Sequence, residues 1–156
     1  TKEGAERAVK NCLYPPQGVR GLGPGRASMY GLNMVEYAKS ANAEVLVMLQ
    51  AEHIDAVSRI EEILKIPGID MLFVGPFDLA CSMGHMDNPA HPEVEAAIAR
   101  LLEASLNAGV IPGIFCMGAE PAIRRARQGF KFMALGLDSL YLNAGAEAEL
   151  EALRQA

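Results

Sequence analysis

The stretch from Glu44 to Leu79 reads EVLVMLQAEHIDAVSRIEEILKIPGIDMLFVGPFDL. Two apolar runs of strand length, Glu44–Gln50 and Ile69–Gly75, flank an amphipathic segment, and an acid follows each run: Glu52 after the first and Asp78 after the second. This order predicts a β-α-β unit, in which neighbouring parallel strands lie about 4.8 Å apart. Because the carboxyl ends of parallel strands meet at one edge, we expect the two acids to lie close enough to share one cation.

The rest of the chain continues this alternation. Ahead of the stretch, apolar spacing predicts helices over Glu3–Leu13 and Asn33–Asn42, separated by a glycine-rich loop over Gly18–Gly31. Further predicted elements are helix Ile54–Ile66, helix Glu93–Ala108, strand Ile111–Cys116, helix Glu120–Gln128, strand Phe132–Gly136 and helix Leu140–Arg154. The near-continuous apolar character of the first strand, Glu44–Gln50, indicates burial on both faces, as in a parallel sheet.

Four consecutive βα units specify an α/β fold with a parallel sheet and right-handed crossovers. Four strands cannot close a barrel, and a TIM (β/α)₈ barrel takes about 250 residues. The 156-residue chain is therefore either an open, doubly wound sheet or the C-terminal half of a TIM barrel. In both folds the chemistry belongs at the carboxyl ends of the strands.

Composition narrows the class of protein. The chain is 51% hydrophobic and 21% charged, as expected for one soluble globular domain, and its net charge of −5 argues against nonspecific nucleic-acid binding. No apolar run approaches the roughly 20 residues that span a bilayer, and no secretory leader is visible. Three scattered cysteines are typical of free thiols in a reducing compartment, so we expect a cytoplasmic protein without membrane contact.

Several short motifs occur in the same order as in a known enzyme family. They are Tyr14–Gly21, Gln50–Glu52, Gly75–Leu79, Asn88–Val94, Pro112–Ile114 and Leu135–Asp138. Together they resemble the HpcH/HpaI aldolase family, whose members include class II, metal-dependent 4-hydroxy-2-oxoheptanedioate and 2-dehydro-3-deoxyglucarate aldolases. The resemblance implies a TIM barrel in which residues 1–156 supply strands five to eight. It favours the C-terminal half of a single barrel domain over the open sheet.

The resemblance also implies roles for individual residues. Glu52 and Asp78 match metal ligands, and carboxylates suit Mg²⁺, or else Mn²⁺ or Co²⁺. Gln50 matches a residue that hydrogen-bonds to the bound keto acid. The backbone N–H groups of Phe77 and Asp78 match those that receive the substrate carboxylate, since Pro76 has no N–H to donate. Phe77 replaces the small residue that is usual in the family, which leaves the acceptor open.

The implied function is carbon–carbon bond cleavage or formation through a pyruvate enolate, with a keto acid (pyruvate or oxaloacetate) and an aldehyde as substrates and a homo-oligomer as the assembly. A first alternative is an enzyme like macrophomate synthase, which decarboxylates oxaloacetate and forms a carbon–carbon bond. A second is a catalytically incomplete half-barrel that serves only in assembly. The family's general-base histidine, its acidic partner and its substrate-binding arginine belong to the other half of the barrel.

Other candidate residues receive structural interpretations. The Gly21–Gly25 run lacks a preceding strand, so a surface loop or lid is favoured over a nucleotide loop. His85 and His91 are either a zinc-binding pair or a loop and a turn histidine, and the second is favoured. The remaining expectations are solvent exposure for His53, a loop salt bridge for Arg20, a helix cap for Asp138, and no catalytic thiol at Cys81 or Cys116 for want of a partner base.

Overall fold

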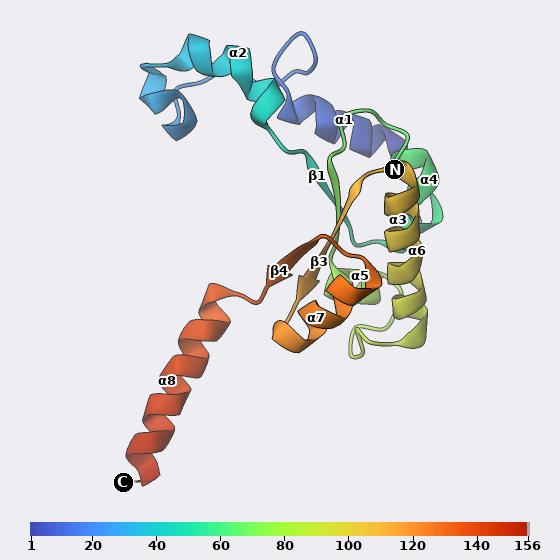
Figure 1. The fold of residues 1–156 in the computed structure, drawn as a ribbon, viewed down its shortest axis with the longest axis vertical. Coiled ribbons are helices and arrows are strands. Elements are labelled where there is room, and N and C mark those ends of the chain that lie inside the picture. Colours follow the sequence, from blue (N-terminus) through green and yellow to red (C-terminus); the bar gives the residue numbers. More distant parts are fainter. Residues whose placement is uncertain (156) are drawn as a thin grey trace.

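The computed structural model describes residues 1–155 and contains a four-stranded parallel sheet (Figure 1). The strands are β1 (Met48–Ala51), β2 (Met71–Val74), β3 (Ile111–Cys116) and β4 (Phe132–Leu135), and they lie side by side in chain order. Every neighbouring pair is parallel. The predicted α/β fold with four consecutive βα units and a parallel sheet is therefore confirmed.

Helices precede the first strand, connect the strands and follow the last one. They are α1 (Lys2–Cys12), the 3₁₀ segment η1 (Arg26–Gly31), α2 (Met34–Glu44), α3 (Ile54–Ser58), α4 (Ile60–Ile63), α5 (Pro76–Ser82), α6 (Pro92–Ala108), α7 (Ala119–Gln128) and α8 (Asp138–Gln155). The Thr1 hydroxyl caps α1 by accepting the Gly4 N–H at 3.2 Å. The predicted helix Ile54–Ile66 is wrong in one respect, because Arg59 leaves helical geometry (φ −117°, ψ 16°) and divides it into α3 and α4.

Two further boundaries differ from the sequence prediction. Glu44 ends α2 instead of starting the first strand, since helix α2 runs on into the apolar segment. Helix α5 was not expected, because its seven residues are too few to show a helical period. It begins with Pro76 directly after β2, a position that suits proline because its missing N–H would have no helical acceptor there.

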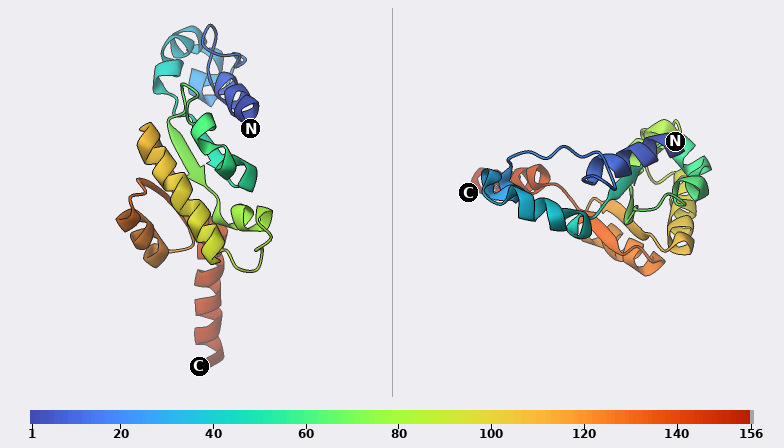
Figure 2. Two further views of the ribbon diagram at one scale, coloured as in Figure 1. Left: turned by 90° about the vertical axis from the view of Figure 1, so that its right-hand side faces the viewer. Right: turned by 90° about the horizontal axis from the view of Figure 1, so that it is seen from above.

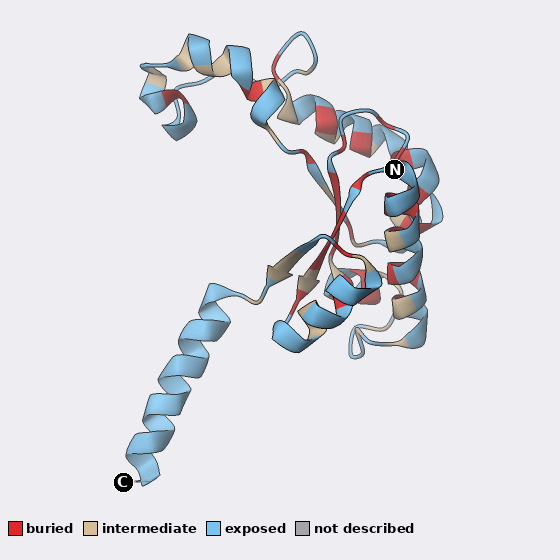
Figure 3. Ribbon diagram, viewed as in Figure 1, coloured by how far each residue is buried: buried red, intermediate tan, exposed pale blue. Residues whose placement is uncertain are grey.

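One face of the sheet is covered by helices and forms the core. Figures 1 and 2 show α1, α3, α4, α5, α6 and α7 on the same side of the strands. Side chains from this face of β2 and β3 pack with the inner faces of α5 and α6. The fully buried members of this core are Val74, Leu79, Val94, Ile98, Leu101 and Ile114, and Figure 3 shows burial concentrated there.

The opposite face has no layer of described elements over it. On this face Met48, Ile111 and Phe132 are 38%, 38% and 41% exposed. The central strand β2 is nonetheless buried at all four positions, in part because the Phe73 ring meets the Phe132 ring edge-to-face at 6.1 Å. Burial on both faces, which the sequence predicts for the first strand, is therefore wrong, because β1 is an edge strand with Met48 and Gln50 exposed.

Asp70 fixes the alignment of the first two strands. Its carboxylate accepts the Val47 N–H at 2.7 Å, and its own N–H donates to the Val47 carbonyl at 3.0 Å. Its carbonyl then accepts the Ile111 N–H of β3 at 3.0 Å. These three bonds keep the first residues of β1, β2 and β3 in register. The register places Met48 beside Met71 and Ala51 beside Val74.

Helices α2 and α8 extend away from this body on the side of the uncovered face (Figure 1). Helix α8 has no buried residue over its 18 positions, although it carries Leu140, Leu142, Leu150 and Leu153. It runs unbroken through Asn143 and Gly145, in line with the predicted helix Leu140–Arg154. No helix within residues 1–155 is long and apolar enough to cross a membrane.

We predict that Ile114→Ala lowers the free energy of unfolding by roughly 2–5 kcal/mol, because Ile114 is fully buried between the central strands and the helices. Ile123→Ala on α7 is the matched control: Ile123 is 53% exposed, so the change should be within about 0.5 kcal/mol. Urea titration followed by circular dichroism measures both. Equal losses for the two variants would show that the helix-covered face is not the core.

Candidate functional site

The predicted cation ligands Glu52 and Asp78 follow β1 and β2, which are neighbouring parallel strands. Ala51 lies opposite Val74, so Glu52 follows beside Gly75, which precedes the Pro76-Phe77-Asp78 segment. Both Glu52 and Gly75 are half-buried, whereas Asp78 is exposed. Glu52 and Asp78 thus follow neighbouring strands at one edge, as the arrangement of a shared cation site requires.

Gly75 has a role that the sequence did not reveal. A Cβ atom built there would lie 2.7 Å from the Glu52 Oε2 atom and 3.3 Å from its Cβ atom. Its backbone (φ −99°, ψ 94°) is open to any residue, so glycine is needed here for space and not for conformation. The side chain of Glu52 therefore lies against the strand end of β2. In the sequence, the Gly75-Pro76 pair of the Gly75–Leu79 motif was the available signal for this role of Gly75.

Helix α5 positions Asp78 and Phe77. Buried Leu79 and Ala80 anchor the helix in the core, which leaves its first turn at the sheet edge. Gly75, the N-cap residue, has no side chain to cap that turn, and Pro76 has no N–H. The N–H groups of Phe77 and Asp78 have no acceptor within the helix, so they are available to an anion.

Gln50 and the aromatic side chains lie on the uncovered face. Gln50 is exposed and pairs in register with Phe73, so the two share a face of the sheet. Phe77 is 46% exposed, and its ring meets Phe115 of β3 edge-to-face at 6.5 Å. Gln50 and Phe115 thus belong to the uncovered face of the sheet, and Phe77 of α5 contacts that face through Phe115.

This donor set fits a hard divalent cation, because ionised carboxylates are the ligands that Mg²⁺ and Mn²⁺ prefer. A free first turn beside it fits the carboxylate of a keto acid. No histidine of the part that the structure describes lies at this edge as a general base. His53, which follows Glu52, is exposed and accepts the Asp55 N–H at 3.2 Å as the N-cap of α3, which confirms its predicted exposure.

Arg20 and Asp138 have structural positions. The Arg20 guanidinium lies 4.6 Å above the centre of the Tyr14 ring, and no salt bridge forms at Arg20 within residues 1–155, so the predicted ion pair is wrong. Asp138 opens α8, and its carboxylate accepts the Ser139 N–H at 2.8 Å. The glycine-rich loop leads into η1 and follows no strand, in line with the surface-loop interpretation.

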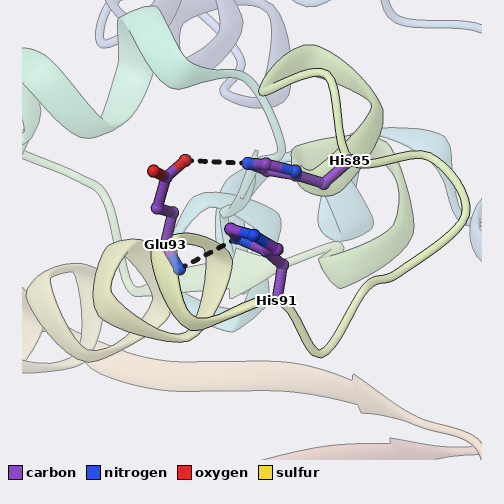
Figure 4. A group of neighbouring side chains, drawn as sticks. All are labelled: His85, His91 and Glu93. Atoms are coloured by element: carbon purple, nitrogen blue, oxygen red, sulfur yellow. Dashed lines mark hydrogen bonds and ion pairs between the residues drawn. The ribbon is translucent and has the colours of Figure 1, made fainter.

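His85 and His91 are close together (Figure 4). Their rings stack with centroids 3.6 Å apart and planes inclined by 13°. His85 Nε2 lies 2.8 Å from a Glu93 carboxylate oxygen, and His91 Nδ1 accepts the Glu93 N–H at 3.3 Å as the N-cap of α6. The hydrogen bond to His85, aided by the charges of both histidines, lowers the pKa of the Glu93 carboxyl group. His85 lies in a loop, as predicted, whereas His91 is the N-cap residue of α6 and not a turn residue.

Cys116 is buried at the end of β3. Burial raises the pKa of its thiol, and the guanidinium groups of Arg125 and Arg124 act weakly in the opposite direction. Arg125 is itself committed elsewhere, since it binds both Glu95 carboxylate oxygens at 2.7 and 2.6 Å. Cys81 on α5 is exposed.

Comparison with known proteins places this arrangement in a family. The sequence matches the HpcH/HpaI aldolase/citrate lyase family over residues 1–144. It is 40% identical over 147 residues to a 4-hydroxy-2-oxo-heptane-1,7-dioate aldolase of Klebsiella pneumoniae, covering 94% of this chain and 56% of the relative. It is 37% identical over 155 residues to a hydroxypyruvate/pyruvate aldolase of Paraburkholderia phytofirmans, covering 96% of this chain and 59% of that protein.

Solved structures agree. An HpcH/HpaI aldolase/citrate lyase family protein of Burkholderia cenocepacia superposes with a TM-score of 0.89 at 37% identity, over 99% of this chain and 62% of that one. Macrophomate synthase superposes with a TM-score of 0.72 at 24% identity over 100% of this chain and 57% of its own, a likeness that shows the fold alone. The chain thus spans less than two thirds of the length of the proteins it matches.

Thiol reactivity should follow burial. We predict that iodoacetamide at pH 8 alkylates Cys116 at least roughly tenfold more slowly than Cys81, because the folded chain keeps the Cys116 thiol protonated and covered. The raised pKa also means that the stability this thiol contributes falls as the pH rises above its ordinary range, since the unfolded thiol ionises first. Mass spectrometry of each cysteine peptide measures the rates. In urea the difference should vanish, and equal rates in the folded chain would contradict the assignment.

Proposed function

The chain belongs to the HpcH/HpaI aldolase/citrate lyase family, and from this premise we propose that it carries the cation-binding and keto-acid-binding part of a pyruvate aldolase site. Glu52 and Asp78 would hold the divalent cation, most simply Mg²⁺. When bound, the cation supplies Lewis-acid stabilisation of the enolate of a pyruvate-type keto acid. The reaction class is carbon–carbon bond cleavage or formation.

The observation that carries this proposal is the contact of Glu52 with Gly75. A side chain at position 75 would displace the Glu52 carboxylate, so the glycine keeps that carboxylate at the strand end beside α5. The same glycine leaves the first turn of α5 uncapped. One residue thus makes room both for a cation ligand and for an anion-binding backbone, and a chelated keto acid needs the two side by side.

The other residues of the edge would bind and orient the keto acid. The N–H groups of Phe77 and Asp78 would donate to its carboxylate, and the Gln50 amide would donate to its keto oxygen. The rings of Phe77 and Phe115 would form one wall of the space in which the aldehyde is received. The family resemblance assigns proton transfer to a histidine of the other barrel half.

The whole activity therefore belongs, in this proposal, to a complete barrel. The chain spans 56% and 59% of the length of two curated relatives. Strands β1 and β4 are the edge strands of the described sheet, one face of which is uncovered. Residues 1–156 would be the C-terminal half of one barrel domain, completed where each free edge pairs with a further strand. Full turnover is expected only when the residues of the other half are present.

A second candidate function shares the same edge. Oxaloacetate decarboxylation followed by carbon–carbon bond formation, as in macrophomate synthase, would use the same enolate, and that enzyme has the same fold. Turnover of oxaloacetate compared with 4-hydroxy-2-oxo acids, measured on the complete protein, separates the two. A preference of at least roughly tenfold in kcat/KM for one substrate would assign the reaction.

The third candidate is an assembly subunit without catalysis. The uncovered sheet face and the free edges of β1 and β4 favour it, because unpaired strand edges associate readily. A homo-oligomer of such chains would bury apolar side chains such as Met48, Ile111 and Phe132. This candidate predicts association without cation-dependent chemistry.

The proposal is tested by cation binding and by proton exchange. We predict that Glu52→Gln, Asp78→Asn and Gly75→Ala each weaken Mn²⁺ binding at least roughly tenfold, the first two by loss of a ligand and the third by displacing Glu52. Calorimetry on this chain measures the affinity. On the complete protein, EDTA should abolish the exchange of pyruvate methyl hydrogens for deuterium, followed by NMR.

Glu149→Gln is the matched control, because Glu149 lies exposed on α8 and should leave Mn²⁺ affinity unchanged. Proton exchange that persists in EDTA would sink the metal-dependent mechanism. Unchanged Mn²⁺ affinity in Glu52→Gln and Asp78→Asn would remove the assignment of the site.

We also predict that the isolated chain self-associates. In sedimentation velocity it should run larger than a monomer, and Phe132→Lys should shift it toward the monomer by placing a charge on the uncovered face. Ile123→Lys, on the outer side of α7, should leave the distribution unchanged. A stable monomer with one sharp unfolding transition would contradict both the half-barrel and the assembly candidates.

A further inference from the structure

A second group of possible metal ligands lies outside the carboxylate edge. His85, His91 and Glu93 each offer one ligand atom, and these atoms lie within 4.8 Å of one another. His85 and His91 are half-buried, which limits the positions that their rings can take, while the Glu93 carboxylate is exposed. The three residues come from the loop after α5 and from the first turn of α6.

We propose that His85, His91 and Glu93 form a second, separate cation site, selective for a borderline transition ion such as Zn²⁺. Neutral imidazole nitrogen suits Zn²⁺, Ni²⁺ and Cu²⁺, whereas Mg²⁺ prefers oxygen ligands alone. Three protein ligands and one water complete a tetrahedral zinc site. The chain would then bind two kinds of ion at one end of the sheet, each at its own ligand set.

The side chains need only a small rearrangement. Zinc–ligand bonds of about 2.0–2.1 Å put neighbouring ligand atoms roughly 3.3 Å apart. The 2.8 Å contact between His85 Nε2 and the Glu93 carboxylate is shorter than this spacing, so an ion between them would move the two groups slightly apart. The stacked rings, 3.6 Å apart, must separate by rotation so that one nitrogen of His91 also points at the ion. The 3.3 Å cap bond of His91 and the stacking itself are given up in this turn.

The charges explain why Glu93 is required. The N-terminus of a helix carries partial positive charge and repels a cation, and both histidines lie at or near the start of α6. The Glu93 carboxylate in the first turn offsets that field and adds an anionic ligand. The other acid of this turn, Glu95, is held by Arg125 and does not compete.

Proton balance at the site is simple. A neutral His85 ring moves its hydrogen from Nε2 to Nδ1 when Nε2 binds the ion, so no net proton is lost. A protonated ring must release one proton. Protons therefore compete with Zn²⁺ for the ligand nitrogens, so the affinity should be lower in acidic buffer.

The experiment uses Zn²⁺ as the probe. Calorimetry at pH 7.5 is run on the Glu52→Gln/Asp78→Asn double variant, in which the carboxylate edge cannot compete for the ion. We expect one Zn²⁺ per chain that excess Mg²⁺ does not displace. His85→Phe keeps a ring in the stack, His91→Asn keeps a helix-capping acceptor, and Glu93→Gln keeps a hydrogen-bonding partner for His85, so each removes a ligand with little disturbance of the fold. Each should weaken Zn²⁺ binding at least roughly tenfold.

His53→Asn is the matched control. His53 is also a capping histidine followed two residues later by an acid, Asp55, but it has no second histidine beside it. Its removal should leave Zn²⁺ binding unchanged. Carbethoxylation read by mass spectrometry adds a second readout: Zn²⁺ should protect His85 and His91 and leave His53 reactive.

Three outcomes would overturn the proposal: no saturable Zn²⁺ binding in the double variant, an equal loss in His53→Asn, or unchanged affinity in all three ligand variants. Because the double variant lacks the carboxylate ligands, failure here leaves the aldolase proposal untouched. Conversely, loss of Mn²⁺ binding at the edge leaves the zinc site intact.

Discussion

The alignment of β1 with β2 is the constraint on which the rest of the structure depends. Asp70 sets it by bonding to both the N–H and the carbonyl of Val47 at the start of the pair. A slip of one residue would send every side chain of β1 to the other face. Glu52 would then lose its place against Gly75, and Leu49 and Ala51 in the core would be exchanged for Met48 and Gln50.

Much of the fold could be predicted from local sequence. Apolar runs of strand length marked all four strands, and amphipathic spacing marked the long helices, because burial of one stripe imposes that spacing. The order of the strands followed from the βα alternation. The acids Glu52 and Asp78 were visible as candidates because each follows a strand, and the family resemblance, not the spacing, gave them chemical roles.

What local sequence could not give depends on pairs of residues far apart in the chain. The need for glycine at position 75 arises from Glu52, 23 positions earlier, and only the register brings them together. The exposure of Met48 and Phe132 reflects which elements lie over a face, which no strand pattern encodes. The stacking of His85 on His91 needs the loop to fold back, and sequence spacing alone favoured two unrelated histidines.

Helix α8 differs from the rest in what holds it together. None of its 18 residues is buried. Its side-chain contacts are short-range in sequence, such as those of Glu151 with Arg154 and Gln155. A helix of that length without tertiary packing is marginally stable in water, since nucleation is costly. In the monomer its amide hydrogens should therefore exchange on the timescale of a free peptide, while those of β2 wait for global unfolding. One chain thus contains two cooperative units of very different stability.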